Sequence, residues 1–325
     1  MVEWESYEKT YSSVLSVFAS VNRFAEQVQL KGLRPRTVEA YVAVVRQLAQ
    51  WAGGDPAGLA EERVRAYFLH LLNERGYAPQ SMRQARVALA AFYVEGLGRT
   101  EWRVFAAVAT RDRERLPVVL SQAEVRRILR EVKEPRFRVP LRLIYLCGLR
   151  LSECLHVEVR DIDRAAGRLH VRDGKGGKDR YVPLPAAALE DLTAWWRQHR
   201  HPTYLFPAMG HGWRATQRRR PEQQAQVQGA KLQAATYPMS TSALQNVWRL
   251  ARAASGVTKP ATIHTLRHSY ATHLLEAGVS LRYVSQYLGH ASLEQTLVYA
   301  HLTEASEAQT HAALGRLAAA LSLKD

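Results

Sequence analysis

Apolar residues recur every three or four positions along most of the chain, and a two-residue period replaces this spacing in one short segment. The longer period is typical of α-helices that bury one face, whereas the shorter period is typical of β-strands. The two-residue period covers 168–172 and 180–185, on either side of the glycine-rich turn DGKGGK. The chain is therefore predicted to be mainly α-helical, with one small antiparallel β-hairpin sheet.

The first third of the chain predicts a compact helical domain. Four apolar stripes with helical spacing follow one another, and Gly or Pro residues mark the short connections between them. We expect these helices to form an N-terminal four-helix domain within 1–110. The stripes cover Val14–Val28, Val38–Ala49, Val64–Leu72 and Ala85–Tyr93.

A charged stretch without apolar periodicity follows, and we expect a linker at 111–117. A second domain at 118–325 then opens with SQAE at 121–124, a capping box in which each end of the motif satisfies a free helix N–H. A length of 325 residues is typical of two such domains. The polar, Gln-rich segment 208–236 predicts an exposed insertion that is partly ordered at most.

The chain is strongly basic, with 45 Lys and Arg residues against 30 Asp and Glu residues and a formal net charge of +15. Residues 1–117 hold 16 basic and 13 acidic side chains, whereas 118–325 hold 29 and 17. Such an excess favours a polyanionic partner, because cations that displace counterions supply non-specific affinity for nucleic acid. Only 8 of the cations are lysine, and codon bias explains this ratio as well as phosphate binding does.

Simple features disfavour several other classes of protein. The best apolar run, 139–149, contains Arg142 and is shorter than the ~18 residues of a membrane span. The opening MVEWESYEKT is acidic and lacks the apolar core of a signal peptide. Cys147 and Cys154 are too few for a metal cage or a disulfide framework, and we expect two buried thiols. These features predict a cytoplasmic protein with no membrane partner.

The C-terminal part of the chain holds the polar residues that are the best candidates for catalysis. His264 and Arg267 are three residues apart at the start of a predicted helix, so they project from one face. A helix from Ser280 then ends before Gly-His290, and a last helix carries Tyr299. Taken singly, each feature has an ordinary explanation as a capping pair, a helix stop or a core tyrosine with its hydroxyl at the rim.

Together, in this order and spacing, the motifs resemble the tyrosine recombinase (phage integrase) family. The resemblance covers essentially the whole second domain, and it implies that family's mixed α+β catalytic fold for 118–325. It also implies that the N-terminal helices form a SAM-like core-binding domain. The motifs are GLRLSE at 148–153, GKGGK at 174–178, HTLRHSYATHLLEAG at 264–278 and YLGHASLEQTLVYAHL at 287–302.

The resemblance implies a nucleophile and a phosphate clamp. Tyr299 would attack a DNA phosphodiester and form a 3′-phosphotyrosyl link, which leaves a free 5′-hydroxyl. Arg150 and Arg267 would clamp the non-bridging oxygens of the scissile phosphate, and His290 would complete the phosphate pocket. Because the bond energy is kept in the phosphotyrosine, the reaction would be reversible.

The remaining roles concern proton transfer and support. His264 would hydrogen-bond the phosphate and assist as a general base, and Lys175 would protonate the leaving 5′-oxygen. Lys178 is the alternative to Lys175 as the acid, since both lie in the glycine-rich turn. Glu153 would orient Arg150 without reacting itself.

The expected chemistry agrees with these residue types. Phosphoryl transfer gathers negative charge on the equatorial oxygens, and preorganised cations stabilise that charge best where water is excluded. A tyrosine with a pKa near 10 is a weak nucleophile and needs a base or a cationic pocket. Asp161 and Asp163 have no partner motif for two-metal catalysis, so we expect neither a metal nor another cofactor.

Some neighbouring segments are expected to have structural roles. His268 and His273 lie on the same predicted helix as Arg267 but, we expect, off its catalytic face, as packing or capping residues. The tail 303–325 carries apolar residues at helical spacing. It could dock on a neighbouring subunit or pack on its own domain.

The resemblance implies a site-specific recombinase or integrase that exchanges strands of double-stranded DNA through a Holliday junction. Its partners would be DNA sites and three further copies of the chain in a homotetramer, without a small-molecule substrate, and the protein would associate with the nucleoid. The insertion at 208–236 favours a role in integration or excision of a mobile element. The alternatives are a Xer-type resolvase of chromosome or plasmid dimers, a relaxing topoisomerase, and a non-catalytic DNA-binding regulator on the same scaffold.

Overall fold

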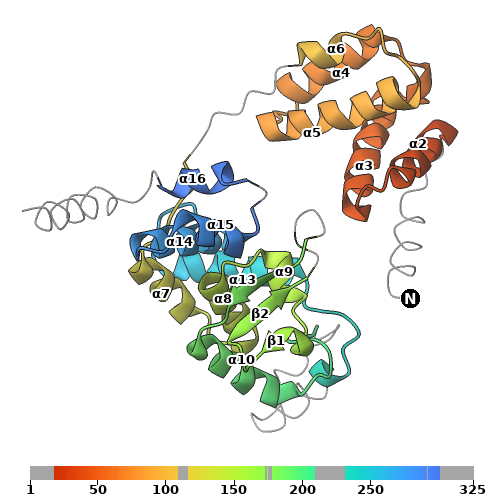
Figure 1. Cartoon of the computed structure of the whole chain (residues 1–325). Coiled ribbons are helices and arrows are strands. Elements are labelled where there is room, and N and C mark those ends of the chain that lie inside the picture. The colour runs from red at the N-terminus through yellow and green to blue at the C-terminus, as the bar shows by residue number, and fades with distance from the viewer. Residues whose placement is uncertain are drawn as a thin grey trace, which may run out of the picture. The chain divides into compact units, whose positions relative to one another are not determined.

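The computed structural model describes residues 18–108, 116–172, 174, 178–208, 231–290 and 292–300. The chain divides into two compact units, Met1–Arg115 and Leu116–Asp325 (Figure 1). Each unit has its own hydrophobic core. The expected tail at 303–325, most of the expected linker and Lys175 lie outside the described residues.

The first unit is helical throughout its described part. Pro35 and Pro79 occupy the first position of their helices, where the missing N–H costs nothing. The helix α3 (Pro35–Ala52) ends at Gly53, whose φ of 74° is accessible to glycine at little cost. The helices are α2 (Ala19–Leu30), α3 (Pro35–Ala52), α4 (Glu61–Asn73), α5 (Pro79–Ala90) and the short α6 (Val104–Ala107), with a 3₁₀ turn, η1 (Pro56–Gly58), after α3.

Aromatic side chains fill the core of this unit. The rings of Phe24 and Phe92 meet edge to face with centroids 5.3 Å apart, a favourable geometry for aromatic pairs. Tyr93 is fully buried, and its hydroxyl donates to the Pro56 carbonyl oxygen at 2.7 Å. Both Phe92 and Tyr93 lie in η2 (Ala91–Gly96), a π-helical turn that continues α5. The four predicted helices are confirmed, while α6 and η2 add two features that the apolar spacing did not reveal.

The second unit surrounds a small sheet with helices. The capping box at its start is confirmed, because the Ser121 hydroxyl accepts from the Glu124 backbone and the Glu124 carboxylate accepts from the Ser121 backbone. None of the helices within the described residues is both long and apolar enough to cross a membrane. The helices are α7 (Gln122–Glu131), α8 (Pro135–Cys147), α9 (Leu151–Leu155), α10 (Ala186–His199), α13 (Thr241–Ala254), α14 (Ile263–Glu276), α15 (Leu281–Leu288) and α16 (Glu294–Ala300), with one 3₁₀ turn, η3 (Val159–Asp161).

The sheet has three antiparallel strands in the order β1-β2-β3. The predicted hairpin is confirmed as β2 (Arg168–Val171) and β3 (Arg180–Pro183), whose register pairs Leu169 with Val182. Both of these side chains are buried, so one face of the hairpin packs on the core. The strand β1 (Ile162–Asp163) has only two residues, too few for a sequence period to reveal it.

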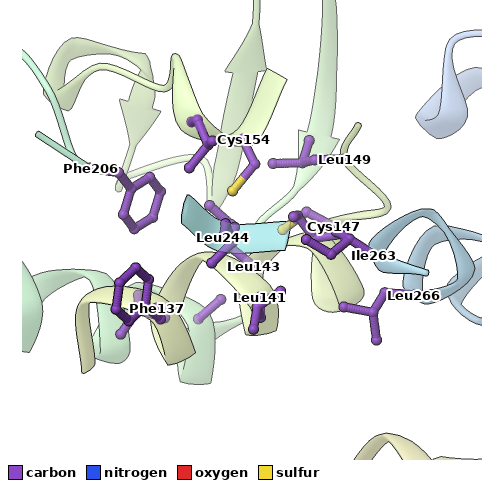
Figure 2. Close-up of a cluster of buried hydrophobic side chains, with 14 of the residues drawn as sticks. Phe137, Leu141, Leu143, Cys147, Leu149, Cys154, Phe206, Leu244, Ile263 and Leu266 are labelled. Atoms are coloured by element: carbon purple, nitrogen blue, oxygen red, sulfur yellow. The ribbon is translucent and has the colours of Figure 1, made fainter. Parts of the chain in front are cut away.

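The central helix α8 organises the core of the second unit. Its side chains pack with residues from α9, α13 and α14 in one apolar cluster (Figure 2). Cys147 and Cys154 are buried and free, as predicted, and burial raises the pKa of the Cys147 thiol to about 12. The helix ends at Gly148, where a φ of 63° reverses the chain toward α9.

The segment 208–236 is described only at Ala208 and at 231–236. Leu232 is buried and belongs to the main core, and the imidazole of His201 contacts the Ala235 carbonyl oxygen at 2.9 Å. The prediction of an exposed segment is therefore wrong at Leu232, whereas Gln233, Ala234 and Thr236 are exposed as expected. A single apolar anchor among Gln and Ala residues gave no periodic signal. The arginine run at 218–220 lies outside the described residues.

Candidate active site

The polar residues singled out in the second unit converge from four helices. Arg150 precedes α9, His264 and Arg267 lie on α14, His290 follows α15, and Tyr299 is on α16. The charges of Arg267 and Arg150 act on both His264 and Tyr299, and the rings of His290 and Tyr299 stack with centroids 6.3 Å apart. Five of the six predicted site residues thus form one cluster, and the sixth, Lys175, lies outside the described residues.

Arg150 is held by the first turn of α9. Its backbone N–H donates to Glu153 Oε2 at 2.8 Å, and its guanidinium Nη1 donates to Glu153 Oε1 at 2.6 Å. The side chain of Arg150 keeps 23% of its surface exposed, whereas that of Glu153 keeps 6%. Glu153 therefore holds Arg150 in place, and part of the Arg150 side chain stays accessible to solvent. This arrangement fits the orienting role expected of Glu153.

Arg180 is a member of this cluster that the sequence analysis missed. Its guanidinium donates to both oxygens of Glu153, at 3.0 and 2.7 Å, and its Nε donates to the Tyr287 carbonyl oxygen at 2.8 Å. One signal was present, because the strand period puts Arg180 on the same face as buried Val182. An inward-facing arginine requires a carboxylate partner.

Glu153 carries a negative charge in an almost buried position. Burial alone would raise the pKa of Glu153, but hydrogen bonds from Arg180 and the charges of Arg180 and Arg150 lower that pKa to about 2. A carboxylate surrounded by cations stays ionised, and it offsets part of their mutual repulsion. This balance allows several guanidinium groups to lie within one small region.

Arg267 is the most deeply buried cation of the cluster, with 1% of its surface exposed. It donates to the carbonyl oxygen of Gly148 at 2.7 Å and to that of Leu288 at 2.5 Å. These carbonyls terminate α8 and α15, and the free carbonyls at a helix C-terminus attract cations. Burial and the charge of Arg150 lower the pKa of Arg267.

Gly148 lets the ring of Tyr270 approach the backbone closely. A Cβ atom at this position would lie 2.4 Å from the ring of Tyr270, which is itself buried. The positive φ of Gly148 also disfavours any other residue. The GLR motif therefore requires its glycine for two separate steric reasons.

His264 lies at the solvent-facing side of the cluster. It is exposed, and a pocket of about 700 Å³ opens beside it, with Arg249 and Arg252 of α13 in its lining. Partial burial and the charges of Arg267 and Arg150 lower the pKa of His264, so the ring is neutral at neutral pH. A neutral imidazole has one N–H donor and one acceptor nitrogen, so it can form a hydrogen bond of either kind with a ligand that enters from the pocket.

Tyr299 lies at the inner side of the cluster, with 4% of its surface exposed. Its hydroxyl forms a 2.6 Å hydrogen bond with His268 Nδ1. Burial raises the pKa of Tyr299, while Arg267 and Arg150 act in the opposite direction. Next to it, His290 Nδ1 forms a 2.7 Å hydrogen bond with the Thr296 hydroxyl, which orients the imidazole.

Two family models match the chain, and together they cover both units. The phage integrase family model matches residues 118–306, and the model of the phage integrase N-terminal SAM-like domain matches residues 21–102. The chain belongs to the phage integrase family. It is a tyrosine recombinase, an enzyme that breaks and rejoins DNA. The expected mainly helical fold with a SAM-like first domain is confirmed.

Two similar proteins are also named as recombinases. An integrase/recombinase from Escherichia coli is 32% identical over 336 residues, which cover 95% of this chain and 98% of the relative. The tyrosine recombinase XerA of Thermococcus kodakarensis is 32% identical over 288 residues, with coverage of 87% and 90%. Both alignments extend well beyond the catalytic motifs into the first unit.

Solved structures share the fold at lower identity. A lambda integrase dimer bound to a COC′ core site has a TM-score of 0.64 at 19% identity, covering 86% of this chain and 94% of that one. The XerH recombinase bound to a palindromic difH substrate has a TM-score of 0.58 at 19% identity, with coverage of 86% and 78%. The recombinase fold is thus preserved although most side chains differ.

The position of His268 in this recombinase differs from the one predicted from the sequence. The prediction that it lies off the catalytic face is wrong, because α16 packs against α14 and brings the Tyr299 hydroxyl to its Nδ1. A signal existed in the spacing, since His268 is four residues from His264 and hence on the same side of the helix. The prediction for His273 is confirmed, because its Nδ1 bonds the Tyr145 hydroxyl at 2.9 Å in a packing contact.

Proposed function

We propose that this recombinase cleaves DNA with Tyr299 as the nucleophile. The observation that carries the proposal is a buried phenol under the combined charge of Arg267 and Arg150. A phenolate developing on Tyr299 and a phosphodiester beside it would both be stabilised by these fixed cations. The hydroxyl of Tyr93, a buried tyrosine of the first unit, donates instead to the Pro56 carbonyl oxygen.

The proposed reaction is a direct displacement at phosphorus. The Tyr299 oxygen forms a bond to the phosphorus as the bond from phosphorus to the 5′-oxygen breaks, and the electron pair leaves on that oxygen. Negative charge grows on the two non-bridging oxygens, which Arg150 and Arg267 would bind from sides fixed by Glu153 and by two helix ends. His264 and His290 would donate further hydrogen bonds to the same phosphate.

The leaving 5′-oxygen needs a proton, which we assign to Lys175 at the turn between β2 and β3. The support is its place in the GKGGK motif, and Lys178 in the same turn is the second candidate. Arg180, the first residue of β3 after this turn, reaches Glu153 in the cluster. A lysine reaching from the turn toward this cluster would meet the phosphate from the side opposite Tyr299.

The proposed partner is double-stranded DNA at a specific site, bound by a homotetramer that passes through a Holliday junction. The net excess of 12 positive charges in 118–325 supports contact with a DNA backbone. Solved structures with the same fold include a lambda integrase tetramer bound to a Holliday junction. The corresponding location of the enzyme is the cytoplasm, in association with the nucleoid.

The biological role that we propose is integration or excision of a mobile element. The integrase/recombinase relative that aligns over 95% of the chain supports it. A Xer-type resolvase of chromosome or plasmid dimers is the second candidate, favoured by the XerA relative at the same 32% identity.

The decisive experiment traps the covalent intermediate on nicked suicide duplexes of randomised sequence. Cleavage next to a nick releases a short strand and leaves the protein attached to DNA, so the adduct survives denaturing electrophoresis. Sequencing the attached DNA gives the site. We expect an adduct with the wild-type chain and none with Tyr299→Phe.

Tyr283→Phe is the matched control, since Tyr283 is exposed on the neighbouring helix α15. An adduct that persists in Tyr299→Phe would refute the assignment of the nucleophile. The absence of any adduct from the wild-type chain would favour the non-catalytic regulator.

A further inference from the structure

The hydroxyl of Tyr299 is bound by a histidine that the motif-based roles leave unassigned. His268 Nδ1 lies 2.6 Å from the Tyr299 oxygen, and the two rings are 5.6 Å apart at their centroids. The imidazole of His268 also meets that of His264 edge to face, with centroids 4.6 Å apart. His268 thus connects the proposed nucleophile to the histidine that faces the pocket.

The same type of contact occurs a second time on α14, without a site around it. His273 Nδ1 lies 2.9 Å from the Tyr145 hydroxyl. The groups that act electrostatically on this second pair are Arg126 and Glu276, whereas Arg267, His264 and His290 act on His268. The pair at Tyr299 therefore differs from its counterpart by its cationic surroundings, and not by the hydrogen bond itself.

We propose that His268, and not His264 as the motif implied, is the general base for Tyr299: its Nδ1 accepts the hydrogen bond of the phenol, aims the oxygen lone pairs at the scissile phosphate, and takes the proton during attack. The inference rests on the proposed role of Tyr299. In the step, the O–H bond of Tyr299 breaks and its proton moves to Nδ1, while the phenolic oxygen bonds to phosphorus. The bond to the 5′-oxygen breaks, and that oxygen takes a proton from the lysine of the turn. In the reverse reaction, His268 returns its proton to Tyr299.

In the free enzyme, the electrostatics of the site keep the phenolic proton on Tyr299. Burial, together with His264, Arg267 and His290, lowers the pKa of His268 to about 4, while burial raises the pKa of Tyr299. A phosphodiester bound among these groups carries the opposite charge and offsets the effect of the cations on the imidazole. Bound DNA therefore makes proton transfer from Tyr299 to His268 less unfavourable than it is in the free enzyme.

Two substitutions separate orientation from proton transfer. In His268→Asn, the side-chain amide oxygen occupies roughly the place of Nδ1 and accepts the hydrogen bond, but it is not basic. In His268→Phe, a ring of similar shape offers no acceptor. His273→Asn is the matched control on the same helix.

The main measurement is the single-turnover rate of adduct formation at saturating suicide duplex, using the site recovered from the randomised library and the full-length chain. General-base catalysis is typically worth 10² to 10⁴ in rate, so we expect His268→Asn to be slower by about 100-fold and His268→Phe by more. His273→Asn should remain within about twofold of the wild-type rate. The affinity for DNA should change little in all three variants, since His268 and His273 each bond a tyrosine hydroxyl of the protein itself.

A second measurement reports the base directly. Fluorotyrosine at position 299 has a more acidic phenol and depends less on a base, so it should restore much of the rate lost in His268→Asn. A variant that is slow because of a packing defect would gain nothing from this change. In addition, the ¹⁵N spectrum of histidine-labelled protein should show an unprotonated Nδ1 for His268 in the free enzyme, which requires no catalysis.

The outcomes are distinguishable. If the wild-type chain forms no adduct, the proposed function fails. If the wild-type chain forms the adduct and His268→Phe reacts at the same rate, the role of His268 is refuted while the function stands. A wild-type rate in His268→Asn, or no rescue by fluorotyrosine, overturns proton transfer. A protonated Nδ1 in the free enzyme overturns the acceptor role, even if the Phe variant fails to fold.

Discussion

The two units of this recombinase bury very different side chains. Tyrosines aside, Ser20 is the one buried polar residue in the described part of the first unit. Burying a polar or charged group costs free energy unless it is fully paired. The second unit therefore sacrifices part of its packing stability for a polar centre, whereas the first unit is stabilised almost entirely by apolar contacts. The described part of the second unit buries nine polar or charged residues, namely Asp161, His199, His201, Thr265, Arg267, Ser269, Thr272, Ser285 and Thr296.

The largest expected effect contrasts one buried tyrosine from each unit. Tyr299→Phe should abolish covalent DNA cleavage, a loss of at least about 1,000-fold, because it removes the oxygen proposed to attack the phosphorus. Tyr93→Phe should leave cleavage unchanged and reduce the free energy of unfolding by about 1 to 2 kcal/mol, because the Pro56 carbonyl oxygen loses its donor. Adduct gels and chemical denaturation of both variants check this contrast. Comparable losses of cleavage would remove the distinction between the units.

The next effect contrasts two arginines. Arg267→Lys should slow cleavage by about 100-fold or more, since an ammonium group does not reproduce the planar fork that bonds two carbonyls and is proposed to bind the phosphate. Arg63 in the first unit stacks on the ring of Trp51 at 4.3 Å. Arg63→Lys should alter the cleavage rate at saturating DNA by less than about twofold. Single-turnover rates measured at saturation exclude differences in binding.

A third prediction concerns the pH dependence of stability. The folded-state pKa of Glu153 is lowered from 4.5 to about 2, so its ionisation stabilises the fold above pH 4.5, and this stabilisation is lost as the pH falls toward 2. Such a shift corresponds to a free energy on the order of 3 kcal/mol. Glu153→Gln should therefore destabilise the chain strongly at pH 7 and much less at pH 3. Urea denaturation at both pH values measures the difference, and an equal loss at both would contradict the assignment.

The smallest effect concerns binding of non-specific DNA by the separate units. Residues 1–117 have a net charge of +3 and residues 118–325 a net charge of +12. Because counterion release scales with the number of phosphates neutralised, the first unit should bind non-specific duplex more weakly and with a shallower salt dependence. Fluorescence anisotropy over a salt series measures both slopes. A steeper slope for the first unit would show that local clusters outweigh net charge.

The sequence predicted the helices and the hairpin well, because both are encoded locally. The helix at 263–276 was expected from Thr262 to Glu276, and the glycine-rich turn indicated the hairpin. The contacts of Arg180 and His268 were missed because they join elements far apart in sequence, a strand to α9 and α14 to α16. The buried end of the insertion was missed for another reason, since Leu232 alone forms no pattern.

The anchoring of Arg267 has a consequence for how freely this protein can diverge. Its two strongest partners are main-chain carbonyls, at Gly148 and Leu288, and a substitution of the Leu288 side chain leaves its carbonyl in place. The guanidinium is therefore positioned by the path of the backbone, and selection on most surrounding side chains can relax without moving it. Gly148 is the exception, because any added side chain there would clash with the ring of Tyr270 and would strain a backbone with positive φ. Amino-acid substitutions should thus be rare at a few turns and more frequent along the helices that those turns connect.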